Sequence, residues 1–534
     1  MIERPKLAAS VVLALLVGLV SAYLTAINQS VPISYFQVLA IVQASLLGII
    51  IAIYILSSQL AANQYSIRLL SIHQGDNTFA VVIGLFGISI LLDIFGILSN
   101  AIIVGVISSI SVAITSTFAV GAFSSLYLIK DSLIERTQPE TIADRIRANV
   151  TPENLRSEIG KSRLRPYLAY FEAARAAIES GDNQAARQIV TALSDKVTAS
   201  LNEILEADSA SNDELILASK QIINDLEDIL DKLVESENTL LIQQVSTNIF
   251  KSGKTALESD LDTVGSSAGY TLFKIGDLVL LWDDIESVSK FPWGAFGKLL
   301  GIASEKQLEE TIRTLTLANS NLLLTIEEEH SFERSFQLRI ANILVEGYLN
   351  AWKRYISHSG AQISPDDILI GDPEFMELGE FENLYNYYEN GYKSIGRVLA
   401  KLVCGSGALS PGSFQLAKTT IEGLSDVAIV AGNEDNKSLA KHIVKLTIMT
   451  GIGLDQQNSK FVDLPSVMTD IRDSNAKNAE AVNSAFTELQ NLKHQGMNNQ
   501  HWHLSLLMYR YDDDENVIAE FENNVAELYN KMSD

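Results

Sequence analysis

The chain has 534 residues, of which 65 are acidic and 40 basic, so its formal net charge is −25. Apolar residues still make up 47% of the chain, and the mean hydropathy is +0.15. Residues 1–128 hold only three acidic and three basic side chains, so the rest of the chain holds all of the surplus charge. This division excludes a plain soluble globule. It also excludes nucleic acid as an expected partner, because a strongly acidic domain repels phosphates.

The first part of the chain is expected to span a membrane. Four apolar stretches precede residue 130, namely Leu7–Ile27, Tyr35–Leu56, Phe79–Leu98 and Ile102–Ile129. Each has close to the roughly 20 residues that a helix needs to cross the hydrocarbon core. The first stretch follows Arg4 and Lys6 as a secretory signal would, but it is longer than a signal's apolar run. We therefore predict a domain of four transmembrane helices over residues 1–130, with the first helix retained as an anchor.

The charged residues between the stretches predict the orientation of this domain. Basic residues lie before the first stretch, at Arg68 after the second, and at Lys130 and Arg136 after the fourth. The connections 28–34 and 99–101 contain no charge. By the positive-inside rule, both termini are expected in the cytoplasm of a multi-pass plasma membrane protein.

Polar residues inside the stretches are the candidate site. Asp93 is the ionisable residue well inside a stretch, which makes it a functional-site hypothesis by default. Gln43, Ser108 and Ser111 are expected at comparable depths. A pathway-lining carboxylate and a carboxylate bonded to its neighbours both remain open. The small residues of the fourth stretch, with Ser108, Ser111 and Thr115 on one face, favour close helix packing over a pore lining.

The connection after the second stretch carries a motif, made of Ser58, Gln59, Tyr65, Ser66, Arg68, Leu69, Leu70 and Asp76. It resembles the signature of a prokaryotic family of predicted membrane proteins, domain-of-unknown-function family 2254. That family has a Ser-Gln box, an aromatic-Ser-Pro-Arg-Leu-Leu box and an Asp, and Ile67 stands here in place of its proline. The resemblance covers the four stretches and this loop. It implies an integral membrane protein with a large cytosolic C-terminal region, and the family's activity is unassigned.

The remainder of the chain is predicted to be all-α. A helical stalk is expected over 131–150 and a cytosolic helical domain over 151–534, with a subdivision near residue 360 left open. Apolar residues recur at helical spacing in Arg165–Ser180, Asn183–Leu205, Asp213–Leu233, Glu305–Glu329 and Arg334–Tyr355. Helix starts are predicted at Thr151-Pro152-Glu153, Asp372-Pro373-Glu374 and the capping box of Ser304 and Gln307. Breaks are predicted at Glu206–Asn212, Gly265–Gly269, His358–Pro373, Gly405–Ser413 and Leu454–Pro465. No repeat of fixed period is found.

Known chemical motifs are incomplete in this domain. Gly253-Lys254-Thr255 lacks the first glycine of a phosphate-binding loop, and Gly451-Ile452-Gly453 lacks the third glycine of a dinucleotide site. His501 and His503 lie two residues apart, which suits a surface pair better than a metal site on a helix. Cys404 is the single cysteine, and the cluster of Tyr385, Tyr387, Tyr388 and Tyr392 is expected to pack a helix. No cofactor or metal is predicted.

The sequence favours an oligomeric channel, transporter or membrane sensor coupled to a cytosolic helical domain. The alternative is a membrane-anchored scaffold, in which the stretches only hold a protein-interaction module at the bilayer. A membrane enzyme is the third hypothesis, because no catalytic group of residues is complete. The expected partners are the lipid bilayer, further copies of the chain and a cytosolic protein.

Overall fold

The structure is a computed structural model of the whole chain. It describes residues 33–64, 78–102, 110–122, 138–158, 165–207, 213–280, 291–328, 333–359, 384–404, 410–455, 463–490 and 515–533, with Val20, Tyr23 and Ile363. Every regular element in these ranges is a helix, which confirms the predicted all-α class. Contacts divide the chain into two compact units, residues 1–150 with 162–193 and residues 151–161 with 194–534.

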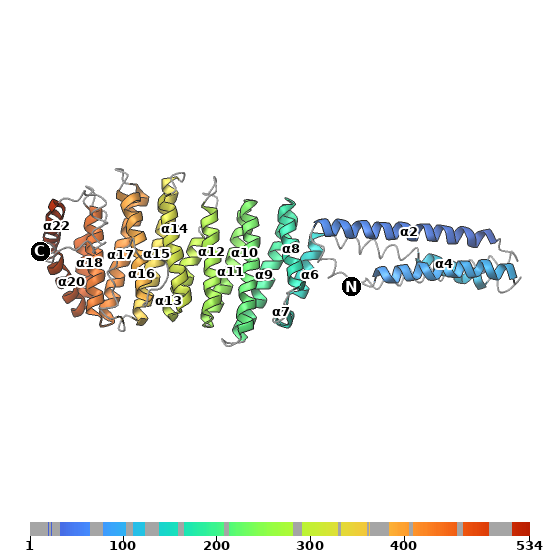
Figure 1. The fold of residues 1–534 in the computed structure, drawn as a ribbon, viewed down its shortest axis with the longest axis horizontal. Coiled ribbons are helices and arrows are strands. Elements are labelled where there is room, and N and C mark those ends of the chain that lie inside the picture. The colour runs from blue at the N-terminus through green and yellow to red at the C-terminus, as the bar shows by residue number, and fades with distance from the viewer. Residues whose placement is uncertain are drawn as a thin grey trace. The chain divides into compact units, whose positions relative to one another are not determined.

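The first unit is built on a helical hairpin. Its two long helices, α2 (Ile33–Gln64) and α4 (Thr78–Ile102), lie side by side (Figure 1). A shorter apolar helix, Ile110–Ala122, follows them. Two amphipathic helices, α6 (Pro139–Asn149) and α8 (Arg165–Glu179), and the first half of α9 (Asn183–Ala207) complete the described part of the unit. The predicted stalk at 131–150 is therefore described only from residue 138 onward, where α6 begins at a proline.

The described residues support two of the four predicted spans. Two helices in the described residues are long and apolar enough to cross a membrane, Ser34–Leu56 on α2 and Ala80–Leu98 on α4. The described part of the fourth stretch, Ile110–Ala122, is shorter than a span, and the first stretch lies outside the described residues except for Val20 and Tyr23. Only 11% and 28% of the residues in the two long helices are buried, whereas the core helix of a soluble protein is mostly buried.

The second unit is a succession of helices, several of them joined by short turns. In chain order they are α7 (Pro152–Glu158), the second half of α9 (Asn183–Ala207), α10 (Asp213–Glu235), α11 (Thr239–Glu258), α12 (Asp262–Val279), α13 (Phe291–Lys306), α14 (Glu309–Glu328), α15 (Arg334–Ser359), α16 (Leu384–Val398), the π-helical turn η5 (Leu399–Cys404), α17 (Pro411–Asn433), α18 (Lys437–Asp455), α19 (Leu464–Ser474), α20 (Ala476–Leu489) and α22 (Glu515–Ser533). The predicted breaks after α9, α15, η5 and α18 coincide with ends of these helices.

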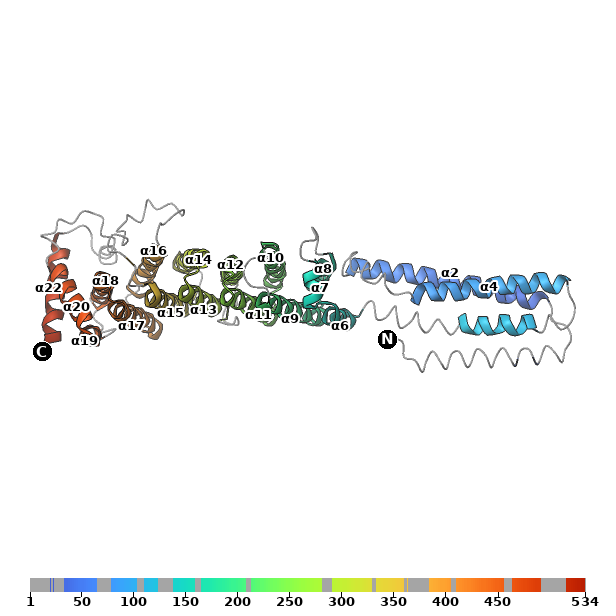
Figure 2. The same cartoon turned by 90° about the horizontal axis from the view of Figure 1, so that it is seen from below.

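The helices from α10 to α17 form two rows. In one row α10 contacts α12, α12 contacts α14, and α14 contacts α16. In the other, α11 contacts α13, α13 contacts α15, and α15 contacts α17 (Figure 2). Helices adjacent in the sequence contact each other across the rows. Each helix therefore packs on its near neighbours, as in stacked helical pairs, and the helices do not surround one common core.

One turn geometry recurs between these helices. Gly181, Glu237, Asp260, Gln307 and Asp435 each follow a helix and each have a positive φ, between 54° and 72°. At Glu237 the backbone N–H of the next residue reaches back to Leu233 O, and at Asp260 it reaches Ala256 O, as in a Schellman motif. Asp182 and Asn238, which follow Gly181 and Glu237, then cap the next helix through their side chains. The chain thus reverses in very few residues.

Two predicted boundaries are wrong. Ser304 does not open a helix, because its hydroxyl donates to Leu300 O in the last turn of α13 and Gln307 occupies the positive-φ turn. The cap of α14 comes instead from Asp262, whose carboxylate accepts from the backbone N–H groups of Glu310 and Thr311 at 2.8 Å each. The predicted break at Gly265–Gly269 lies inside α12. A Cβ at Gly269 would come 2.5 Å from Leu315, so that glycine permits close approach to α14.

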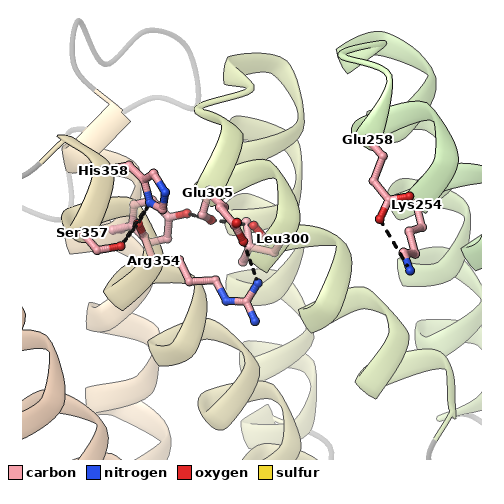
Figure 3. A network of polar contacts seen from close by, with 9 residues as sticks. Lys254, Glu258, Leu300, Glu305, Arg354, Ser357 and His358 are labelled. Carbon is pink, nitrogen blue, oxygen red and sulfur yellow. Dashed lines mark hydrogen bonds and ion pairs between the residues drawn. The ribbon is translucent and has the colours of Figure 1, made fainter.

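Ion pairs connect neighbouring helices within a row. Arg354 on α15 pairs with Glu305 on α13 at 3.1 Å, while Lys254 pairs with Glu258 within α11 (Figure 3). Lys274 on α12 contacts both Glu227 and Asp231 on α10, at 2.7 and 3.0 Å. The hydrogen bond to Glu227 raises the pKa of Lys274 above its usual value. Charged side chains on the surface of the domain therefore also connect neighbouring helices.

Candidate functional site

The two long apolar helices, α2 and α4, pair in a defined antiparallel register. Phe36, near the start of α2, packs on Gly96, near the end of α4, where a Cβ would lie 2.6 Å from the ring. Further along α2, Ile50 clusters with Val82 and Phe86 from the first half of α4. Each step of seven residues forward on α2 therefore corresponds to seven residues backward on α4.

Three polar residues occupy this seam between the helices. The residues of α4 that face inward are Val82, Phe86, Ser89, Asp93 and Gly96, at alternating spacings of four and three. On α2, the fully or almost fully buried residues are Phe36, Gln43 and Ile50, seven apart. The register places Gln43 opposite Ser89, and Asp93 lies one helical turn further along the same face.

These three side chains are completely buried, and the described residues offer their polar atoms no hydrogen-bond partner. Gln43, Ser89 and Asp93 are each 0% exposed. Both polar atoms of the Gln43 amide, the Ser89 hydroxyl and both Asp93 carboxylate oxygens have no hydrogen-bond partner in the part of the chain that the structure describes. Buried polar groups are ordinarily hydrogen-bonded, because an unpaired one costs free energy. Such a cluster in an apolar hairpin is therefore a candidate site.

The outer surface of the hairpin has the opposite character. Large apolar side chains point outward along both helices, including Ile41, Ile49, Val81, Leu91 and Phe95, each at least half exposed. Polar groups inside and apolar groups outside are the reverse of a water-soluble protein. This distribution fits helices whose surroundings are lipid tails.

The third apolar helix joins this unit through small residues. Thr115, Ser116, Ala119 and Ala122 are buried on Ile110–Ala122, and Ser116 Oγ lies 2.9 Å from the Tyr35 hydroxyl on α2. Thr115 donates back to Ser111 O at 3.0 Å within its own helix. These hydroxyls form hydrogen bonds between the helices or within their own helix, as the interpretation of close helix association predicts.

The structure brings two of the four predicted site residues together. It places Asp93 and Gln43 on the same seam, and it leaves Ser111 half-buried on the third helix. Ser108 lies outside the described residues. Ser89 was not predicted, although its spacing of four from Asp93 already places it on the same helix face.

Of the motif residues after the second apolar stretch, Ser58 and Gln59 belong to the described residues. Ser58 and Gln59 lie near the end of α2, where Gln59 is exposed. Tyr65, Ser66, Arg68 and Asp76 lie outside the described residues, as do Leu69 and Leu70.

The candidate motifs of the second unit lie inside helices, where their residues pack against neighbouring helices. Gly253 lies within α11, where a Cβ would come 2.7 Å from Ala268, so Gly253-Lys254-Thr255 is a helical segment and not a phosphate-binding loop. Gly451 and Gly453 likewise lie inside α18. No group of three or more His, Cys, Asp or Glu residues that could hold a metal ion occurs among the residues described. His501 and His503 lie outside them.

The tyrosine cluster of α16 is part of the protein core. Tyr385, Tyr387, Tyr388 and Tyr392 are all buried, and Tyr388 stacks on Trp352 of α15 with ring centroids 6.2 Å apart. The hydroxyl of Tyr388 bonds to Ser304, and that of Tyr392 bonds to Thr450. Burial raises the pKa of both tyrosines well above the usual value. These hydroxyls are therefore neutral structural groups.

Comparison with known proteins does not assign the chain to a family. No family model matches the chain, and no curated protein matches it. Among solved structures, the chain is similar to a circular tandem repeat protein with novel repeat topology and enhanced subunit contact surfaces. The identity is 14%, the match covers 77% of this chain and 91% of that chain, and the TM-score is 0.23.

Proposed function

We propose that this chain is an integral membrane protein that acts as an oligomeric channel, transporter or membrane sensor, coupled to its cytosolic helical domain. The observation that carries the proposal is the buried and unpartnered group of Gln43, Ser89 and Asp93 between two apolar helices. An ionisable residue inside a membrane helix is costly and ordinarily marks an ion pathway, a proton relay or a ligand site. Helices that serve only as an anchor do not need this group.

The surroundings of the site support a membrane location. Large apolar side chains predominate on the surface that faces away from the seam, so the hairpin suits a lipid environment. Four spans with both termini in the cytoplasm of the cell remain our proposal for the topology, in agreement with the loop charges and with the resemblance to domain-of-unknown-function family 2254. A homo-oligomer is expected because so few short helices do not enclose a pore alone.

A membrane-anchored scaffold is the second candidate function. It is favoured by the two rows of helices, because stacked helical pairs present extended surfaces to protein partners. The acidic surface of this region suits a cytosolic protein partner better than anionic lipid.

Flux measurements on Asp93 variants separate the two functions. The full-length protein is reconstituted into vesicles, and flux of Na⁺, K⁺, H⁺ and Cl⁻ is measured for wild type, Asp93→Asn and Asp93→Leu. For a conduit or sensor, both variants change the flux and keep or raise the thermal stability, because a group retained for function is costly for folding. Gln37→Leu, on the exposed side of α2, is the matched control and should resemble wild type.

The scaffold function predicts another pattern. Wild type would then show no flux under any gradient, and Asp93→Leu would lower stability because the carboxylate ties helices together. That combination would favour the anchor over the conduit.

A further inference from the structure

The described residues of α2 and α4 contain no lysine or arginine that could neutralise the charge of Asp93. Between Lys6 and Lys130 the sequence contains one basic residue of this kind, Arg68. Arg68 precedes α4, whereas Asp93 lies toward the opposite end of that helix. A helix rises ~1.5 Å per residue, so the 15 residues from Thr78 to Asp93 span about 22 Å. The described helices therefore supply no lysine or arginine side chain at the level of Asp93.

The polar side chains near the Asp93 carboxylate carry oxygen atoms that can serve as ligands of a cation. The register brings the hydroxyl of Ser89 and the carboxamide of Gln43 to the same level of the seam, one turn from Asp93. All three side chains are fully buried, and their polar atoms have no partner among the described residues. A carboxylate, a hydroxyl and a carboxamide oxygen are the ligands that hard cations prefer.

We propose that Asp93, Ser89 and Gln43 form a binding site for an alkali-metal cation between α2 and α4. This inference rests on the proposed function, since it names the species that the intramembrane site recognises. One carboxylate and one monovalent cation give a neutral site, which a low-dielectric environment requires. A divalent ion would leave an uncompensated positive charge in the same place.

A binding measurement tests this site directly, because it does not depend on transport activity. Full-length protein in detergent is exchanged into choline chloride, and binding of ²²Na⁺ is measured at constant ionic strength. Wild type should bind saturably, and the same titration should raise its thermal midpoint, because a ligand that binds only the folded state stabilises it. Asp93→Asn should weaken the affinity about tenfold or more, and Ser89→Ala and Gln43→Leu should weaken it several-fold.

The controls lie on the same helices. Ser45, whose hydroxyl donates to Ile41 O, and Gln37 are both exposed on α2, so Ser45→Ala and Gln37→Leu should keep the wild-type affinity. Saturable binding that Asp93→Asn leaves intact, or an absence of saturable binding in wild type, would overturn the proposal. If Asp93→Asn fails to fold, unchanged affinity in both Ser89→Ala and Gln43→Leu overturns it equally.

The two proposals fail in different ways. Sodium binding without flux or any effect on the cytosolic domain contradicts the channel, transporter or sensor and leaves the cation site in place. Flux in wild type with no sodium binding contradicts the cation site and leaves the conduit in place.

Discussion

Phe36 of α2 packs directly on Gly96 of α4, with the aromatic ring lying where a side chain on Gly96 would begin. Phe36 is completely buried in this contact. This contact fixes the register of α2 against α4, and the register in turn places Gln43 opposite Ser89. Gly96 has no polar side chain of its own, but its contact with Phe36 thus determines which polar groups of the two helices lie opposite each other.

Replacing this glycine should loosen the hairpin. Gly96→Ala introduces a Cβ at 2.6 Å from the Phe36 ring, and overpacking of this kind costs about 1–3 kcal/mol. The measurement is the thermal midpoint of the full-length protein in detergent. Gly84→Ala on the same helix is the matched control, because a Cβ there meets nothing within 4 Å. Equal midpoints for the two variants would contradict the register described above.

The positive-φ turns predict a stabilising substitution. Glu237 adopts a φ of 54° between α10 and α11, a conformation that costs a residue with a side chain about 1–2 kcal/mol. Glu237→Gly should therefore raise the free energy of unfolding by about 0.5–1 kcal/mol after the entropy of the unfolded glycine is counted. Glu237→Val should lower it, since a branched side chain tolerates this conformation least. Chemical denaturation followed by helical circular dichroism measures both changes.

The ion pairs between α18 and α20 predict a pH dependence. Burial raises the pKa of the Glu488 carboxyl, but hydrogen bonds from Lys441 and Lys445 outweigh burial and leave that pKa below its usual value. A lowered folded-state pKa means that the stabilisation is present above the unfolded value of about 4.3 and is lost as the pH falls through the folded value.

Glu488→Gln tests this dependence. The variant should lose about 1–2 kcal/mol at pH 7, and its difference from wild type should shrink as the pH falls below about 4.3. Denaturation curves between pH 7 and the lowest pH at which the protein stays folded measure this difference. A difference that stays constant over that range would show that the two lysines do not act through charge. Glu203→Gln, at an exposed position of α9, is the control and should change little at any pH.

The predicted orientation can be tested by cysteine labelling. Single cysteines at Asn28 and Ser99 should react with an impermeant maleimide applied to whole cells, because both lie in charge-free outer connections. A cysteine at Asp76 should react only after the cells are opened. External labelling at Asp76 would reverse the proposed topology.

Local sequence signals predicted the helices well and the connections less well. The long apolar stretches on α2 and α4 and the amphipathic segments of α8, α9 and α10 correspond to helices of the structure. The break at Gly265–Gly269 and the capping box at Ser304 were wrong, because glycine and serine can also serve packing and back-bonding inside a helix. Which role they take depends on the neighbouring helix, in these cases Leu315 of α14 and Tyr388 of α16.

The candidate site was predictable in part. Asp93 and Gln43 stood out because polar residues are rare in long apolar segments. That they share one seam with Ser89 depends on the register of α2 against α4, which is set by contacts between residues far apart in the sequence.

The sequence by itself determined the all-helical class, the apolar character of the hairpin helices and the acidic character of the rest, because composition and helical periodicity are local properties. Only the tertiary structure revealed the two rows of helices. The turns at Gly181, Glu237, Asp260, Gln307 and Asp435 share a backbone conformation, but they share neither a residue type nor a fixed spacing, so no sequence repeat marks them. The tertiary structure also decided that Asp262 caps a helix whose first residues lie 48 positions further along the chain, since such a bond forms only once the helices have packed.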